Sequence, residues 1–286
     1  MKNLSSIASA FATRSRRLRN IGRTSEPFIS GDFYASITDL VLEELPLSNK
    51  AISKLKSARV LFVKSELLRE FLLKYGNSIS AEIIICGNSD YDFMQPLAFP
   101  KSVERVFLQN SFISDNKLIF TLPIGIENLR LSINGLPELM KSGMPWYERS
   151  KQVLVGPFSG THPERIEFMK SIKKSKNSLV DILETRISPR NYAALMQKYR
   201  FVLCPRGNGV DTHRFWEALY RGAVPIVVKS KWSQGVRNLK LPFVEITEAT
   251  ETAILEGIED FAGEIKAPSE HPALWSNYWR EKLKIN

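Results

Sequence analysis

The sequence predicts an α/β fold built on parallel sheets, and three observations lead to that prediction. Short apolar runs, of which Phe201–Cys204 and Val224–Val228 are the clearest, have the length of buried strands. Stretches with apolar residues at helical spacing alternate with these runs. Between the two named runs lie a glycine-containing loop and one predicted helix, and such a connection joins parallel strands by a right-handed crossover.

Residues 1–24 are basic and rich in serine, and the first acidic residue of the chain is Glu26. Leu4, Ile7 and Phe11 would share one face of a helix in this segment. Three interpretations stay open: a helix on a membrane surface, an organelle transit peptide, or a frayed terminus. We expect a disordered or peripheral N-terminal arm without a secretory signal, and an anionic membrane is its candidate partner.

Residues 25–148 predict a first domain of the Rossmann-like type. Its predicted strands are short runs of aliphatic and aromatic residues, and its clearest predicted helix repeats apolar residues every three or four positions. The strands are expected at Arg59–Val63, Glu82–Cys86, Arg105–Leu108 and Leu118–Leu122, one helix at Glu66–Lys74 and another at Asp39–Leu45.

Polar side chains follow three of these strands, and α/β domains hold their functional groups at the carboxyl ends of strands. Three of the carboxylates are candidates for a general base that deprotonates an acceptor hydroxyl. The same residue types are common in turns, which is the alternative explanation. The residues are Asn88, Ser89, Asp90, Asp92, Asn110, Glu127 and Asn128, with Asp90, Asp92 and Glu127 as the candidate bases.

Residues 149–286 form the second predicted domain, which follows a linker at Gly143–Ser150. Thr161 and Glu164 have the spacing of a capping box, so a helix is expected to begin at Thr161. The other expected elements are strands at Gln152–Val155 and Phe243–Ile246, a helix from Ser188, a helix at Glu248–Phe261, and an aromatic-rich element at Pro272–Lys284.

The stretch between the two clearest strands has the features of a phosphate site. In the Gly207–Gly209 loop, glycine lets the backbone approach a ligand closely, and Asp211 is expected to cap the helix that follows. A helix N-terminus beside Arg206 and Arg214 favours a phosphate or a pyrophosphate. Glu217 would accept from sugar or ribose hydroxyls. The alternative is an ordinary capped helix with a solvated, charged face.

The segment Cys204–Val228, CPRGNGVDTHRFWEALYRGAVPIVV, resembles the C-terminal signature of exostosin-like glycosyltransferases and of related bacterial polysaccharide-building transferases. Leu122–Asn128 also resembles a segment of these proteins. The resemblance implies a GT-B fold, in which two Rossmann-like domains with parallel sheets face each other across a cleft. Residues 25–148 would then be on the acceptor side and residues 149–286 would bind the nucleotide-sugar. The last helix would return to the first domain.

The resemblance also implies roles for the candidate residues. Arg214 and Glu217 would be catalytic, with Asp90 and Asp92 as candidate bases. The donor site would comprise Arg206, Gly207, Asn208, Gly209, Asp211, Thr212, His213, Ser159, Thr161 and Arg165. The acceptor side would comprise Asn88, Ser89, Asn110, Glu127 and Asn128.

The implied function is transfer of a sugar from a nucleotide-sugar to a glycan or lipid-linked glycan, in bacterial surface polysaccharide assembly. A different phosphate-handling enzyme is disfavoured, because the glycine loop lacks the P-loop and dinucleotide patterns. A nucleic-acid binder is suggested by the net charge of +10, but six of these ten charges lie in the N-terminal arm. A non-catalytic binding module with the same fold stays an alternative.

Two cysteines, Cys86 and Cys204, end apolar runs and are expected to be buried in a reducing compartment. With two cysteines and three histidines, a zinc site is not expected. We expect no cofactor and no essential metal. The expected location is cytoplasmic, with peripheral contact at the inner face of the membrane through the N-terminal arm.

Overall fold

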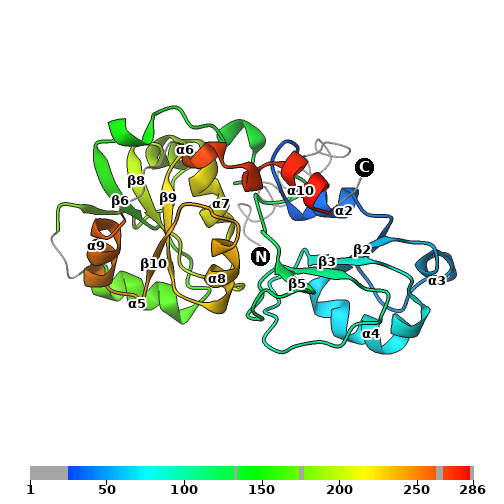
Figure 1. Cartoon of the computed structure of the whole chain (residues 1–286). Helices are drawn as coiled ribbons and strands as arrows, with labels where there is room; N and C mark the ends of the chain where they lie inside the picture. The colour runs from blue at the N-terminus through cyan, green and yellow to red at the C-terminus, as the bar shows by residue number, and fades with distance from the viewer. Residues whose placement is uncertain (1–24, 132–133, 174–176, 262–266, 284–286) are drawn as a thin grey trace, which may run out of the picture.

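The computed structural model describes residues 25–131, 134–173, 177–261 and 267–283, so the N-terminal arm lies outside the described residues. The chain forms two α/β halves, each built on one five-stranded sheet whose strands are all parallel. Figure 1 shows the halves side by side, with the C-terminal half on the left. The predicted fold class, α/β with two parallel sheets, is confirmed.

In the N-terminal half, the strands follow one another across the sheet in chain order, β1-β2-β3-β4-β5. The connections at 88–104 and 109–118 contain no helix. The elements are α2 (Gly31–Ser36), β1 (Leu40–Leu42), α3 (Asn49–Leu55), β2 (Val60–Lys64), α4 (Leu68–Tyr75), β3 (Ile83–Gly87), β4 (Arg105–Leu108) and β5 (Ile119–Thr121), with 3-10 turns at Ser65–Leu67, Gly76–Ser78, Pro137–Leu139 and Trp146–Glu148.

The four strands predicted in this half are present as β2 to β5, but the helix expected at Asp39–Leu45 is wrong. Residues 40–42 instead form the edge strand β1. The reason is a long-range contact: the Asp39 carboxylate accepts from the backbone N–H groups of Arg59 and Val60, at 2.7 and 2.8 Å. These bonds hold the segment against β2, and the proline that follows Leu45 disfavours a helix there.

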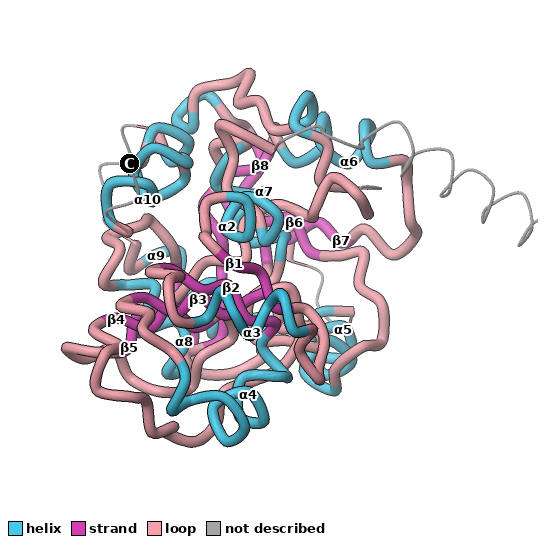
Figure 2. Tube along the Cα trace, turned by 90° about the vertical axis from the view of Figure 1, so that its right-hand side faces the viewer, coloured by secondary structure: helices cyan, strands magenta, loops and turns pink. Residues whose placement is uncertain are grey.

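The two faces of the N-terminal sheet belong to different cores. Along β2, Leu61 and Val63 point into a core that includes residues of α3 and α4. Phe62 points to the opposite face, into a larger core that also contains residues of the C-terminal half. Figure 2 shows α4 on one side of the strands and α2 on the other. The alternation is the two-residue period of a strand that is buried on both faces.

The C-terminal sheet has the strand order β10-β9-β8-β6-β7, so β6 lies between β7 and β8 and the direction of winding reverses there. The elements are β6 (Lys151–Val155), α5 (Pro163–Ile172), β7 (Val180–Ile182), α6 (Pro189–Met196), β8 (Tyr199–Leu203), α7 (His213–Tyr220), β9 (Val224–Val228), α8 (Lys231–Arg237), β10 (Val244–Ile246), α9 (Glu251–Glu259) and α10 (Ser276–Lys282), with 3-10 turns at Pro268–Glu270 and Pro272–Leu274.

Of the helix starts predicted in this half, that of α6 is correct and that of α5 is not. The Ser188 side chain accepts from Asn191 N and caps α6, as expected. The expected cap Thr161 is wrong, because His162 occupies the N-cap position of α5 and its Nδ1 accepts from Glu164 N at 3.2 Å. Pro163 fills the first helical position, and the residue before such a proline becomes the cap.

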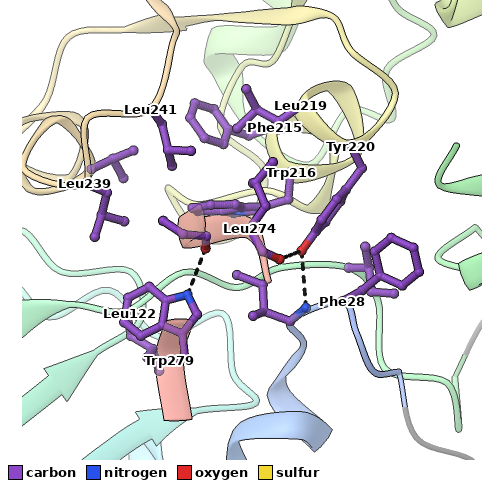
Figure 3. Packing of buried hydrophobic residues seen from close by; sticks show 14 of the residues in the cluster. Phe28, Leu122, Phe215, Trp216, Leu219, Tyr220, Leu239, Leu241, Leu274 and Trp279 are labelled. Atoms are coloured by element: carbon purple, nitrogen blue, oxygen red, sulfur yellow. Dashed lines mark hydrogen bonds between the residues drawn. The ribbon is translucent and has the colours of Figure 1, made fainter. Parts of the chain in front are cut away.

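Helix α10 packs against the N-terminal half. The Trp279 ring is fully buried and lies edge-on to Tyr34 at 5.7 Å and to Phe107 at 6.5 Å between ring centroids. At the other end of this core, the Tyr220 hydroxyl donates to Leu274 O and accepts from Ile29 N (Figure 3). The halves therefore share one continuous hydrophobic core.

Both cysteines, Cys86 and Cys204, are buried and carry free thiols, as expected. A helix long and apolar enough to cross a membrane is absent from the described residues.

The segment predicted as a linker contains a buried cation. Arg149 is 1% exposed and has no carboxylate partner among the described residues. Its guanidinium donates to Met144 O, to Tyr199 O at 2.8 Å and to Arg221 O at 2.5 Å. The last of these is a carbonyl at the end of α7, where a cation also meets the negative pole of the helix. Burial lowers the pKa of the Arg149 guanidinium to about 10.

We expect Arg149→Met to lower the free energy of unfolding by about 3 kcal/mol, because each buried acceptor left without a donor costs about 1–3 kcal/mol. Urea unfolding followed by tryptophan fluorescence measures the loss. Arg200→Met is the matched control, since this half-buried arginine also donates to carbonyls and lies over the Trp146 ring. It should cost about 1 kcal/mol. Equal losses in the two variants would contradict a special role for Arg149.

Candidate functional site

A pocket of about 580 Å3 opens at the carboxyl ends of β6 and β8, at the point where the strand order reverses. In α/β sheets this reversal is where ligands bind. The pocket is lined by residues of both halves: Asp90, Ile124, Glu127, Asn134, Pro157, Ser159, Thr161, Arg165, Arg186, Ile187, Pro189, Tyr192, Gly207, Asn208, Gly209, Asp211, Thr212, His213, Arg214 and Glu217.

The loop between β8 and α7 is closely packed, which explains its two glycines. A Cβ on Gly209 would lie 2.6 Å from the Asn110 side chain, and one on Gly207 would lie 3.0 Å from Arg165. Gly207 N also donates to Gly209 O at 3.0 Å, which closes the loop on itself. A larger residue at position 209 would push the loop away from the opposing half, and one at position 207 would displace Arg165.

Arg214 lies in the first turn of α7, with its guanidinium between two aromatic rings. The ring centroids of Phe158 and Tyr192 are 5.0 and 5.3 Å from its central carbon. Nη2 donates to Pro157 O at 2.9 Å, whereas the buried Nη1 has no hydrogen-bond partner. A buried donor without a partner is costly, so a ligand that accepts from Nη1 would remove that cost.

Arg165 provides a second cation in the same pocket. Its Nη1 donates to Ser159 Oγ and Thr161 Oγ1, at 3.2 and 3.0 Å, and its Nε donates to Arg206 O. The pKa of Arg165 is lowered, first by burial and then by the charge of Arg214. Neither arginine forms an ion pair with a carboxylate of the described residues. Two cations that repel each other in one pocket favour a doubly charged anion.

Glu217 lies one turn further along α7 and is 7% exposed. Its Oε2 accepts from the fully buried Arg221, at 3.0 Å. Arg221 also donates to Leu139 O, and this second bond fixes the position of its guanidinium beside Glu217. Glu217 nevertheless lines the pocket, and its second oxygen, Oε1, forms no hydrogen bond with the described residues. This arrangement holds one carboxylate oxygen toward a ligand.

Asp211 was expected to cap α7, and this expectation is wrong: Thr212 occupies the N-cap position, without a capping side-chain bond. The Asp211 carboxylate is buried, and it accepts from Ile124 N and from Trp216 Nε1, both at 2.8 Å. Asp211 N donates to Asn110 Oδ1 at 2.9 Å. Asp211 thus joins the two halves at the wall of the pocket. Burial raises its pKa to about 7, although its hydrogen-bond donors act in the opposite direction.

Arg206 and Asp92 were predicted to meet the ligand, but they bind each other instead. The Arg206 Nη2 and Asp92 Oδ2 atoms are 2.5 Å apart, and Asp92 Oδ1 accepts from Val210 N. Both oxygens of Asp92 are therefore occupied, and neither residue lines the 580 Å3 pocket. In the same way, Asp90 accepts from Asn208 Nδ2 at 3.1 Å. Loops of the N-terminal half thus hold the glycine loop of the C-terminal half.

Asp90-Tyr91-Asp92 is an Asp-x-Asp sequence, which can place two carboxylates on one cation. The sequence alone therefore does not support the expected metal independence. In the structure, these two carboxylates bind Asn208 and Arg206. A group of three or more His, Cys, Asp or Glu able to hold a metal is absent from the described residues.

A second pocket, of about 240 Å3, adjoins the first and shares Asp90, Ile124 and His213 with it. It contains three of the residues assigned to the acceptor side from the sequence, and its walls are rich in amides. The remaining lining residues are Gly31, Asn88, Ser89, Gln109, Asn128, Arg130 and Leu131. Of the other acceptor-side candidates, Glu127 lines the larger pocket, whereas Asn110 is fully buried and lines neither.

Sequence reasoning missed several lining residues. Tyr192 is one of them: its hydroxyl donates to Gly156 O and its ring lies beside Arg214. Its helical spacing within α6 is that of a core residue, so the sequence carries no signal that it lines a pocket. Arg186 and Ile187 also line the pocket and follow β7, a short strand that the sequence analysis does not predict. With this strand predicted, they would count as candidates, because functional groups lie at the carboxyl ends of strands.

Comparisons with known proteins give short, low-identity matches, and no family model matches the chain. The chain is 32% identical over 73 residues to a probable glycosyltransferase of Arabidopsis thaliana, covering 26% of this chain and 14% of that protein. A second probable glycosyltransferase of that plant is 25% identical over 166 residues, covering 57% of this chain and 30% of its own length. Exostosin-1 of Bos taurus is 29% identical over 86 residues, covering 30% and 11%.

These matches confirm the resemblance to exostosin-like glycosyltransferases, and the chain spans under a third of the length of each of these relatives. Among solved structures, a crystal structure of an α1,3-fucosyltransferase aligns with a TM-score of 0.39 and 14% identity, over 76% of both chains.

The raised pKa of Asp211 predicts a pH dependence of stability. An unfolded chain has an ordinary Asp pKa of about 3.9, so between that value and about 7 only the folded protein holds this proton. The resulting stabilisation is complete below about pH 4 and is lost as the pH rises through 7. The difference in melting temperature between the wild type and Asp211→Asn should be larger at pH 5 than at pH 8. A constant difference would show that Asp211 is ionised throughout.

Proposed function

We propose that this protein is a glycosyltransferase that moves a sugar from a nucleotide-sugar to a hydroxyl of a glycan or lipid-linked glycan. The observation that supports this most strongly is the pair of pocket arginines, Arg165 and Arg214, which have no carboxylate partners among the described residues. They meet at the N-terminus of α7, where backbone dipoles add positive potential. The diphosphate of a nucleotide-sugar carries the negative charge that these two arginines would neutralise, and it would lie in the 580 Å3 pocket.

Catalysis would consist chiefly of stabilising the departing diphosphate. As the bond between the anomeric carbon and the diphosphate breaks, negative charge increases on the phosphate oxygens. The Arg214 guanidinium would stabilise this charge by donating hydrogen bonds to the phosphate oxygens, and the rings of Phe158 and Tyr192 hold the guanidinium in place. Glu217, held by Arg221, would orient the donor through sugar or ribose hydroxyls.

The acceptor would occupy the 240 Å3 pocket, whose lining includes the acceptor-side candidates Asn88, Ser89 and Asn128. We propose that this acceptor belongs to bacterial surface polysaccharide assembly and that the protein acts in the cytoplasm. The N-terminal arm would provide contact with an anionic membrane. The resemblance of Cys204–Val228 to polysaccharide-building transferases supports this assignment.

The role of Arg214 can be tested by substitution. Lysine keeps the charge but loses the planar fork, so Arg214→Lys should be impaired and Arg214→Ala more so. Hydrogen bonds to a charged group contribute about 1.5–3 kcal/mol, so we expect losses of about 10- to 150-fold in kcat and in kcat/KM. In thermal-shift measurements, both variants should lose stabilisation by UDP, GDP, CDP or ADP, whichever binds the wild type, but not by the bare nucleoside.

Arg190→Ala is the matched control, because Arg190 is an exposed arginine of α6 that does not line the pocket. It should keep wild-type kinetics. A wild type that none of the four diphosphates stabilises would refute the proposed donor. An Arg214→Ala variant with unchanged turnover would refute the role of Arg214 alone.

We also propose that transfer needs no divalent cation, because Arg165 and Arg214 provide positive charge for the diphosphate and Asp92 is occupied by Arg206. Turnover of the metal-stripped protein in EDTA should equal turnover with added Mg2+ or Mn2+. A more than tenfold gain on adding either ion, removed by Asp92→Asn, would instead assign a cation to the Asp-x-Asp sequence.

A further inference from the structure

His213 has a ring orientation that fixes its proton. Its Nδ1 lies 2.8 Å from the carbonyl oxygen of Gly125, which belongs to the other half of the molecule. A carbonyl oxygen only accepts, so Nδ1 must carry the hydrogen. In the neutral ring, Nε2 then carries a lone pair, and it forms no hydrogen bond with the described residues. His213 therefore presents a base to its surroundings.

The carbonyl of Gly125 is held in place by its own backbone. Gly125 has a φ of 68°, and a Cβ there would lie 2.1 Å from Ile29 O, so only glycine fits. The next residue, Ile126, donates its N–H to the same Ile29 oxygen at 2.9 Å. The rigid turn gives the segment around Gly125 a role: it sets the tautomer and the direction of the His213 ring.

His213 also lies in the right place, since it lines both pockets. It directly precedes Arg214, which faces the larger pocket, and the smaller pocket holds the amide side chains. A group that removes a proton from an acceptor hydroxyl must lie at this boundary.

Of the four nearby carboxylates, Asp92, Glu127 and Glu217 do not line the smaller pocket, and each of the four accepts at least one hydrogen bond. Asp90 is exposed and accepts from Asn208, and both oxygens of Asp92 are occupied. Glu127 accepts from the backbone N–H groups of residues 134 and 135. Glu217 is paired with Arg221.

We propose that His213 is the general base of the transfer, an inference that rests on the proposed glycosyltransferase function. Nε2 takes the proton of the acceptor hydroxyl while the hydroxyl oxygen forms a bond to the anomeric carbon. The bond from that carbon to the diphosphate breaks, and its electron pair leaves with the nucleoside diphosphate. The imidazolium, held by the Gly125 carbonyl, later releases its proton to solvent. Attack opposite the leaving group inverts the anomeric configuration.

The tautomer can be tested without any substrate. The chain has three histidines, so long-range 1H–15N correlation spectra of the imidazoles are simple, and His213→Asn identifies the signal of interest. We expect the Nδ1–H tautomer for His213 at pH 8, and Gly125→Ala should disturb it. Observation of the Nε2–H tautomer would overturn the proposal.

Kinetics provide the second test. In His213→Asn the amide can still donate to Gly125 O, but no base remains. Loss of a general base costs about 10²- to 10⁴-fold. Turnover of the most active of UDP-glucose, UDP-galactose, UDP-N-acetylglucosamine, GDP-mannose and GDP-fucose, with a methyl glycoside or water as acceptor, should fall by this factor. Stabilisation by UDP or GDP should not change.

The matched control is His162→Asn, the same substitution at the cap of α5, where asparagine is also a good cap and turnover should persist. Full turnover in His213→Asn, or a product with retained configuration, would overturn the base while leaving the proposed function standing. A wild type that binds neither UDP nor GDP and turns over no donor would count against the proposed function. The tautomer spectra would then still show whether Nε2 of His213 is free to act as a base.

Discussion

The buried carboxylate of Asp211 is the contact on which the pocket depends. One of its oxygens binds a backbone N–H of the N-terminal half, and the other binds Trp216 within α7. Its own N–H is held by Asn110. These bonds fix the start of α7, and with it the arginine and the histidine that follow. Around this point, Arg206 with Asp92 and Asn208 with Asp90 hold the glycine loop, so both walls of the pocket keep one geometry.

The shared core limits how far the two halves can move apart. Phe28, Tyr220 and Trp279 pack in one cluster that contains residues of both sheets. The Tyr220 hydroxyl joins Ile29 N of the N-terminal half to Leu274 O, which lies just before α10. Packed cores do not deform continuously. A ligand would therefore enter a pocket that is already formed, which reduces the reorganisation that binding requires.

Much of the fold could be predicted because buried parallel strands are continuous apolar runs, as at Glu82–Cys86 and Phe201–Cys204. The failures come from contacts between distant residues. Residues 40–42 form an edge strand because the Asp39 carboxylate accepts from the N–H groups of residues 59 and 60. Asp211 does not cap α7, because its carboxylate accepts from Ile124 N instead. The pairing of Arg206 with Asp92 spans 114 residues. Local patterns located the glycine loop, but they could not show which of its charges are already neutralised.

The packing of α10 has a consequence for how the chain folds. Arg105 of β4 donates to Lys282 O, 177 residues away, and Glu26 pairs with Arg280, 254 residues away. During synthesis, domains generally fold from the N-terminus onward. Here the first sheet stays without the cover of Trp279 over Tyr34 and Phe107 until the second sheet has been made. The two sheets therefore form a single cooperative unit, and neither half reaches its final stability before α10 has left the ribosome.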